Sequence, residues 1–247
     1  MNALVLAAGM GTRLGELTAD RPKALVEVAG HTMLEHQIRR LKSAGFSRIA
    51  VNVHHFADKI ISYLNANGNF GADIVISDER DLLLDTGGGI RKAFHLFQDD
   101  APMLVHNVDI FSTTDFKTLY TSHLESHADI TLLTADRRTS RYLHFDDKMR
   151  LRGWSNGKTG ETRSPFADFD KSRCTPLAFQ GIHILSRSAL PALDSVAAER
   201  FSITDFYVDN AAALNIRTVC EDPNDWVDAG KPDALESAAK IAMKSMS

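Results

Sequence analysis

The chain has 247 residues, of which 44% are hydrophobic and 24% are charged, and its formal net charge is −4 at pH 7. This composition is typical of a folded globular protein rather than a disordered one. The acidic balance argues against general nucleic-acid binding, which requires a basic face. The length is sufficient for one α/β domain, and we expect residues 1–247 to form a single domain.

The N-terminus and the cysteines favour a cytoplasmic protein. The first residues lack the basic region and long apolar region of a signal peptide, and no apolar run approaches the ~20 residues needed to span a bilayer. Cys174 and Cys220 are far apart and have no metal-binding spacing. We predict two buried free thiols in a reducing compartment, and neither a membrane nor a nucleic acid as partner.

Short apolar runs alternate with amphipathic stretches over the first two-thirds of the chain. We predict strands at 3–7, 48–53, 72–77, 102–106 and 129–134, and helices at 32–44, 56–65, 88–97 and 114–127. This alternation indicates βαβ units. It predicts a Rossmann-like α/β fold, in which a mainly parallel sheet has helices on both faces.

The pattern changes after residue 140. We predict a hairpin at 141–155, a polar loop at 156–172, a strand at 176–185, helices at 188–199 and 204–214, a strand at 216–220 and a C-terminal helix at 232–243. We interpret the β-rich part as a small insertion that covers a cleft at the carboxyl edge of the sheet, where open α/β sheets bind ligands.

The loop after the first strand is rich in small residues. It belongs to "LVLAAGMGTRLGELTADRPKALVEVAG", and its glycines are Gly9 and Gly11. A dinucleotide fingerprint requires a third glycine where Leu14 stands, and the P-loop ending is also absent. The backbone N–H groups of such a loop can approach an anion closely, and Arg13 and Lys23 add positive charge. The alternative is a tight turn beside two surface cations.

Four stretches resemble, in order, the motifs of the sugar nucleotidyltransferases (NDP-sugar pyrophosphorylases). They are "LAAGMGTRL" with "RPKALVEVAG", "LLLDTGGGIRKA", "LVHNVDIF" and "WVDAGKPDAL". Within this family the chain is most similar to the N-acetylmuramate-1-phosphate uridylyltransferases, on its triple glycine, its short length and the absence of a β-helix domain. Glucose-1-phosphate and mannose-1-phosphate nucleotidyltransferases share most of the motifs.

The resemblance implies that an NTP and a sugar-1-phosphate give an NDP-sugar and pyrophosphate, with Mg²⁺ as cofactor. UTP and N-acetylmuramate-1-phosphate, in cell-wall recycling, are the first expectation. A phosphate monoester is largely dianionic near neutral pH, so its oxygen attacks without a general base. The alternatives are a glucose- or mannose-1-phosphate nucleotidyltransferase, a phosphocholine cytidylyltransferase and a non-catalytic sugar-nucleotide sensor. We expect a monomer or simple homodimer.

The resemblance also implies roles for individual residues. Arg13 and Lys23 are catalytic: Arg13 binds the leaving pyrophosphate, and Lys23 binds the α-phosphate and the sugar phosphate. Asp109 and Asp228 hold Mg²⁺. The predicted nucleotide-binding residues are Ala8, Gly9, Gly11, Thr12, Asp85, Thr86 and Gly88. The predicted sugar-binding residues are Asn107, Asn156, Gln180 and Gly181. Residues 1–135 form the nucleotide-binding part, and residues 136–247 form the sugar-binding part and the C-terminal helix.

Several of these positions have a second interpretation. Thr12 is also a candidate helix cap, and the glycines at 87–89 suit a helix start with positive φ. Trp154 and Phe179 are expected mainly in the core. The histidines at 54, 55 and 106 are expected to be structural or to line the cleft.

The sequence departs from the family in three places. Val108 stands where glycine is common, and its side chain would narrow the approach to the nucleotide. Glu16 replaces a proline. An E-K-P motif, whose lysine contacts the sugar phosphate in many relatives, is missing, and none of Arg152, Lys158 and Arg163 is assigned in its place.

Overall fold

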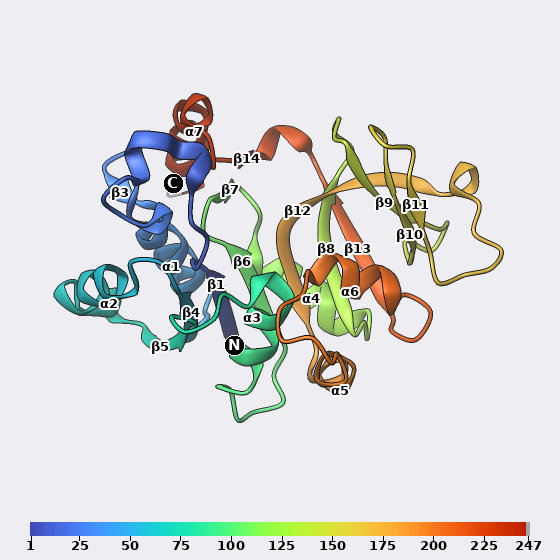
Figure 1. The fold of residues 1–247 in the computed structure, drawn as a ribbon, viewed down its shortest axis with the longest axis horizontal. Helices are drawn as coiled ribbons and strands as arrows, with labels where there is room; N and C mark the ends of the chain where they lie inside the picture. Colours follow the sequence, from blue (N-terminus) through green and yellow to red (C-terminus); the bar gives the residue numbers. More distant parts are fainter. Residues whose placement is uncertain (246–247) are drawn as a thin grey trace.

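The computed structural model of the protein describes residues 1–245 (Figure 1). The first half contains β1 (Asn2–Leu6), β2 (Glu27–Val28), β3 (His31–Thr32), α1 (Met33–Ser43), β4 (Arg48–Val53), α2 (Ala57–Ala66), β5 (Asp73–Asp78), α3 (Asp85–Phe94), β6 (Met103–Asn107), β7 (Ile110–Ser112), α4 (Phe116–Glu125) and β8 (Ile130–Ala135). The second half contains β9 (Arg141–Phe145), β10 (Leu151–Asn156), β11 (Thr162–Arg163), β12 (Thr175–Leu185), α5 (Leu190–Asp194), α6 (Ile203–Asp209), β13 (Ile216–Glu221), β14 (Trp226–Asp228) and α7 (Leu235–Ser245).

One sheet runs through both halves of the molecule. Its order is β11-β10-β9-β12-β6-β1-β4-β5, with β8 beside β12 and β13 beside β8. The strands β6, β1, β4 and β5 are parallel, whereas β12 runs antiparallel to β6, β8 and β9. The predicted α/β fold is therefore confirmed, with the β-rich addition at the edge formed by β9, β10 and β11.

Helices cover both faces of this sheet, as predicted. Side chains alternate along a strand, so Ala3 and Val5 pack into one core while Leu4 packs into the other. The first core includes apolar residues of α1, α2, α4 and α7, and the second includes those of α3, α5 and α6. Burial on both faces explains the nearly continuous apolar run of β1.

The helix predicted at 188–199 extends five residues too far, because α5 ends at Asp194. The next carbonyl groups are used by another element. The Arg91 guanidinium of α3 donates to the carbonyls of Val196 at 2.7 Å and Ala198 at 3.0 Å. Residues 195–201 therefore wrap around Arg91. In addition, α3 begins three residues before the predicted start, at Asp85, and the predicted loop at 156–172 contains β11.

The prediction of two buried thiols is also wrong. Both cysteines are free, but Cys174 is half-buried and Cys220 is exposed. Cys220 lies one residue before the end of β13, beyond the buried residues Ile216 and Thr218 of the same strand face. Within residues 1–245, the helices fall short of the length and apolarity that a membrane crossing requires.

Candidate active site

Four charged side chains from distant parts of the sequence meet at the carboxyl end of β1 and β6. Arg13 lies in a 3₁₀ segment after β1, and Lys23 begins a short 3₁₀ turn. Asp109 lies between β6 and β7, and Asp228 ends β14. Because β14 pairs with β7, and Ala229 N donates to Asp109 O at 2.8 Å, the two aspartates are held side by side.

The distances define a compact cluster of alternating charge. Lys23 Nζ donates to Asp109 Oδ2 at 2.7 Å, and Arg13 Nη1 donates to Asp228 Oδ2 at 3.3 Å. A second Arg13 nitrogen, Nη2, lies 3.8 Å from Asp109 Oδ2. The Asp109 and Lys23 side chains are 8% and 14% exposed, whereas that of Arg13 is 52% exposed. The predicted catalytic pair and the predicted metal-binding pair are thus brought together, with Arg13 open to a ligand.

The small residues of the first loop fit around Lys23. Gly11 has φ +68°, and a Cβ placed on it would lie 2.9 Å from Lys23 Cβ. Gly11 is also the cap residue of the 3₁₀ segment that starts at Thr12, and no side chain caps that end. The interpretation of Thr12 as a helix cap is therefore wrong.

A charged cavity of about 330 Å³ opens beside this cluster. It is lined by Leu6, Ala8, Gly9, Arg13, Lys23, Asn52, Glu79, Leu83, Asp85, Thr86, Asn107, Asp109 and Arg200. Most predicted nucleotide-binding residues are in this wall. Gly11, Thr12, Gly88 and Asp228 are outside it in the described chain, although Asp228 reaches the site through Arg13.

Asn52 and Glu79, which the sequence motifs did not predict, also line the charged cavity. They connect the loop after β1 with the loop after β5. Asn52 Oδ1 accepts from Ala7 N at 2.6 Å and Ala8 N at 3.1 Å, and Asn52 Nδ2 donates to Glu79 Oε1 at 2.9 Å. Glu79 Oε2 accepts from Leu84 N at 3.1 Å. Burial raises the pKa of the Glu79 carboxyl. In the sequence, these two residues could have been recognised as polar residues at the carboxyl ends of two apolar strands.

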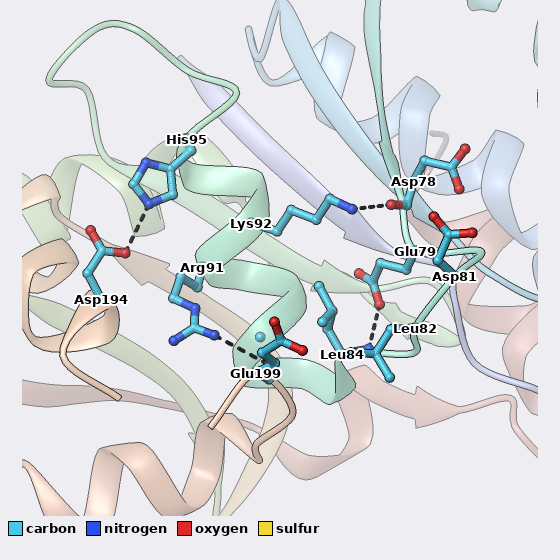
Figure 2. A pocket seen from close by; sticks show the side chains of 11 residues that line it. Asp78, Glu79, Asp81, Leu82, Leu84, Arg91, Lys92, His95, Asp194 and Glu199 are labelled. Carbon is cyan, nitrogen blue, oxygen red and sulfur yellow. Dashed lines mark hydrogen bonds and ion pairs between the residues drawn. The ribbon is translucent and has the colours of Figure 1, made fainter. Parts of the chain in front are cut away.

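Glu79 also lines a neighbouring helix-side cavity of about 700 Å³, shown in Figure 2. Several of its side chains engage one another or the backbone: His95 Nε2 lies 2.9 Å from Asp194 Oδ1, and Lys92 Nζ donates to Asp78 O. Gly88 lines this cavity rather than the charged one.

Close packing explains the triple glycine. A Cβ on Gly87 would lie 2.3 Å from the Phe201 ring, and one on Gly88 would lie 2.2 Å from Glu199 O. Neither of these glycines nor Gly89 has positive φ, whereas Asp85 has φ +59°. The interpretation that these glycines supply positive φ is wrong. They let the start of α3 contact residues 199–201.

That contact brings a third cation, Arg200, to the charged cavity. Gly87 N donates to Phe201 O at 2.8 Å, and Phe201 N donates to Leu84 O at 3.3 Å. Arg200 is exposed, and within residues 1–245 its side chain makes no hydrogen bond or ion pair. The sequence around Arg200 carries no motif, so only the folded chain identifies it.

A sheet-side cavity of about 670 Å³ lies next to the charged cavity, and Asp85 lines both. The sheet-side cavity is lined by Asp85, Thr139, Arg141, Leu143, Trp154, Asn156, Glu161, Arg163, Phe179, Ser202, Thr204 and Asp205. Of the predicted sugar-binding residues, Asn156 lines this cavity and Asn107 lines the charged one. Trp154 and Phe179 pack against the core, as expected, and also form part of this wall.

The other two predicted sugar-binding residues lie behind these walls. Gln180 is 1% exposed, and its backbone oxygen accepts from Trp226 Nε1 at 2.8 Å. Gly181 has φ +75°, and a Cβ there would lie 2.7 Å from Asn107 Nδ2. Gly181 therefore determines how closely β12 approaches Asn107.

The side chains of Val108 and His106 lie in the core and not in the cavity. Val108 is fully buried in the core and does not narrow the cavity. His106 is also fully buried, and burial lowers the pKa of its imidazole to about 3, so it is neutral and structural. His54 contacts Glu79 O at 2.7 Å.

The two aspartates suit a hard divalent cation, because each presents a carboxylate oxygen toward the Arg13 guanidinium. Within residues 1–245, no group of three or more His, Cys, Asp or Glu side chains gathers as a metal site. A cation here would therefore complete its coordination with ligand oxygens and water.

Part of the sequence is similar to two curated proteins of one name. The sequence is 50% identical over 109 residues to N-acetylmuramate alpha-1-phosphate uridylyltransferase of Caulobacter vibrioides, covering 43% of this chain and 45% of that protein. It is 35% identical over 133 residues to the Neisseria meningitidis serogroup B protein of the same name, covering 51% and 57%. These matches thus span about half the length of the relatives.

The fold and the domain match extend further. A putative glucose-1-phosphate thymidylyltransferase from Bacillus anthracis has the same fold, with a TM-score of 0.80 at 16% identity and 98% and 95% of the two chains covered. Residues 3–202 match the MobA-like NTP transferase domain. Since this match covers most of the chain, the protein belongs to the MobA-like NTP transferase family.

Proposed function

We propose that the protein is a Mg²⁺-dependent sugar-1-phosphate nucleotidyltransferase that converts UTP and N-acetylmuramate-1-phosphate to the UDP-sugar and pyrophosphate. The observation that carries this proposal is the cluster of Arg13, Lys23, Asp109 and Asp228 beside two cavities that meet at Asp85. One cavity is charged, and the other is walled by the β-rich edge. The names of the two uridylyltransferase relatives support the choice of substrates.

In this reaction the sugar phosphate oxygen forms a bond to the α-phosphorus of UTP, and the bond from that phosphorus to the bridging oxygen of the β-phosphate breaks. The electron pair leaves with pyrophosphate, which is where negative charge grows. Arg13, being half-exposed and anchored on Asp228, is placed to bind that leaving group. Lys23, held at Asp109, neutralises the two phosphates that approach each other.

The site needs no proton acceptor, because the attacking phosphate is already ionised. In agreement, the residues that line the charged cavity in the described chain include no histidine or cysteine. Asp109 and Asp228 would hold Mg²⁺, which when bound neutralises charge on the phosphate oxygens. The amides of Ala7 and Ala8 are fixed by Asn52, so the loop is organised before substrate binds.

The test is pyrophosphate release with Mg²⁺ for ATP, CTP, GTP, UTP and dTTP, each combined with a panel of acceptors. The acceptors are the 1-phosphates of N-acetylmuramate, N-acetylglucosamine, glucose and mannose, and phosphocholine. We expect the highest kcat/KM for UTP with N-acetylmuramate-1-phosphate. A higher value for another pair would replace the substrate assignment. Nucleotide binding without turnover of any pair would contradict the enzyme assignment and favour a sensor.

A further inference from the structure

The sheet-side cavity contains two arginines in opposite situations. Arg163 donates to Asp205 Oδ1 at 2.6 Å and to Asp209 Oδ1 at 3.0 Å, so its charge is already neutralised. Arg141 is exposed, and within residues 1–245 its guanidinium makes no hydrogen bond, ion pair or ring contact. The backbone N–H of Arg141 donates to Thr139 Oγ1 at 3.3 Å.

The backbone of Arg141 nevertheless belongs to the sheet. Arg141 begins β9 and is paired with Asn156 of β10, and β9 pairs with β12 on its other side. Leu143 lies two residues further along β9 and also lines the cavity. Since residues two apart share a face of a strand, the sheet presents Arg141 and Leu143 to the same cavity.

The acidic residues of this cavity leave Arg141 without a partner. Asp205 is engaged by Arg163, and Asp85 Oδ1 accepts from Thr86 N at 2.7 Å. The third acidic side chain, Glu161, forms no ion pair with Arg141 in the described chain. An arginine that is fixed by its backbone, lines a cavity and lacks a carboxylate partner is suited to bind a carboxylate of a ligand.

We propose that Arg141 binds the lactyl carboxylate of N-acetylmuramate-1-phosphate, and this inference rests on the function proposed above. The acceptor has an anion at each end: the phosphate on C1 and the lactyl carboxylate on the ether at C3. With the phosphate at Lys23 in the charged cavity, the ring extends past Asp85 into the sheet-side cavity, whose wall includes Arg141 but not Lys23. The phosphates of glucose, mannose and N-acetylglucosamine lack the second anion.

Arg200 offers the sharpest comparison, because it is also exposed and unpartnered in residues 1–245 but lines the charged cavity. A residue there faces the part of the substrate that all sugar-1-phosphates share. Arg141 is therefore expected to determine which sugar is used, whereas Arg200 is expected to affect all acceptors alike.

The experiment measures kcat/KM by pyrophosphate release with UTP and two acceptors, N-acetylmuramate-1-phosphate and its neutral lactyl amide. The wild-type enzyme should prefer the carboxylate by about 10- to 100-fold, which is the value of a charge-assisted hydrogen bond. Arg141→Gln should remove this preference mainly by raising KM for the carboxylate. Arg141→Lys should retain part of the preference. Arg200→Gln should lower kcat/KM for both acceptors by the same factor.

The possible results separate the two proposals. If wild type turns over another sugar-1-phosphate but not N-acetylmuramate-1-phosphate, the proposed substrate fails and the role of Arg141 fails with it. Suppose that wild type prefers the carboxylate. If Arg141→Gln keeps that preference, or lowers kcat/KM for both acceptors by the same factor, only the role of Arg141 is overturned. Thermal unfolding checks that each variant folds; loss of an exposed, unpartnered side chain should leave Tm unchanged.

Discussion

Arg13 is positioned mainly by one carboxylate and one glycine. Its side chain is half-exposed and bound to Asp228, and a Cβ on Gly230 would lie 2.3 Å from Arg13 Nη2. Gly230 N also donates to Asp228 Oδ1 at 2.8 Å. The absence of a side chain at Gly230, two residues after Asp228, therefore leaves the space that the guanidinium occupies.

The variant Gly230→Ala should displace Arg13 from its place in the site. Arg13 ends in a mobile, exposed group, so the clash is relieved by moving that group rather than the backbone. We expect kcat to fall by about 10²- to 10³-fold, as for loss of one transition-state donor, with little change in Tm. Gly157→Ala is the matched control, because no described atom lies within 4 Å of a Cβ built there. Unchanged turnover in Gly230→Ala would contradict this role.

Asp109→Asn tests the metal-binding pair. Asparagine keeps the shape of the side chain but removes the charge that faces Lys23 and Arg13. We expect at least a roughly tenfold increase in the Mg²⁺ concentration needed for half-maximal turnover, because a neutral amide is a weaker ligand. The exposed Asp233 lies outside the cavity walls of the described chain, so Asp233→Asn should retain the wild-type Mg²⁺ dependence.

The sequence identified residues in the motifs but not the residues that connect them. Arg13, Lys23, Asp109 and Asp228 each stand in a recognisable stretch, and the structure brings them together. Asn52 and Glu79 act through hydrogen bonds that exist only when two parallel strands lie side by side. Gln180 is buried because Gly181, with its left-handed backbone, interrupts the alternation of β12.

At the scale of elements, the junction of α3 with residues 195–201 connects the two parts of the site. Arg91 holds the carbonyls of that segment, its guanidinium lies 5.2 Å from the centre of the Phe201 ring, and Gly87 bonds to the Phe201 carbonyl. This junction positions Arg200 in the charged cavity. The sequence predicted a helix here because the local pattern does not show that the distant residue Arg91 binds these carbonyl groups.

Gly88→Ala should break this junction. The added methyl group would lie 2.2 Å from Glu199 O, and a backbone atom cannot yield as a flexible side chain does. We expect the free energy of unfolding to fall by about 1–3 kcal/mol, the usual cost of overpacking, despite the better helix propensity of alanine. Urea denaturation measures this change. An unchanged midpoint would show that the junction yields without cost.

At the scale of the whole molecule, buried histidines make the free energy of unfolding depend on pH. Burial lowers the pKa of His106 and His183 to about 3 and that of His123 to about 4, from an ordinary value of 6.5. Below pH 6.5 the unfolded chain binds protons that the folded protein does not bind. The free energy of unfolding therefore decreases as the pH falls from 6.5 toward these values.

His183→Phe should weaken this dependence on pH. Both ring nitrogens of His183 are buried without a hydrogen-bond partner in the described chain, so a phenyl ring loses no such bond there. We expect the slope of the free energy of unfolding against pH, between pH 4.5 and 6, to decrease by about 1.4 kcal/mol per pH unit. Urea titrations at several pH values measure it. The exposed residue His127 provides the control, His127→Asn; an equal slope in wild type and His183→Phe would refute the prediction.

The pairing of β12 has a consequence for the ribosome-bound chain. Strand β8 hydrogen-bonds to β12 and β13, and one edge of β6 pairs with β12. The apolar strands β6 and β8 are therefore synthesised before the strands that pair with them. Between the end of β8 at Ala135 and the start of β12 at Thr175 the ribosome adds about 40 residues, which takes about 2–8 s at ordinary elongation rates. During that time the nascent protein exposes open strand edges, a state in which chaperone capture competes with aggregation.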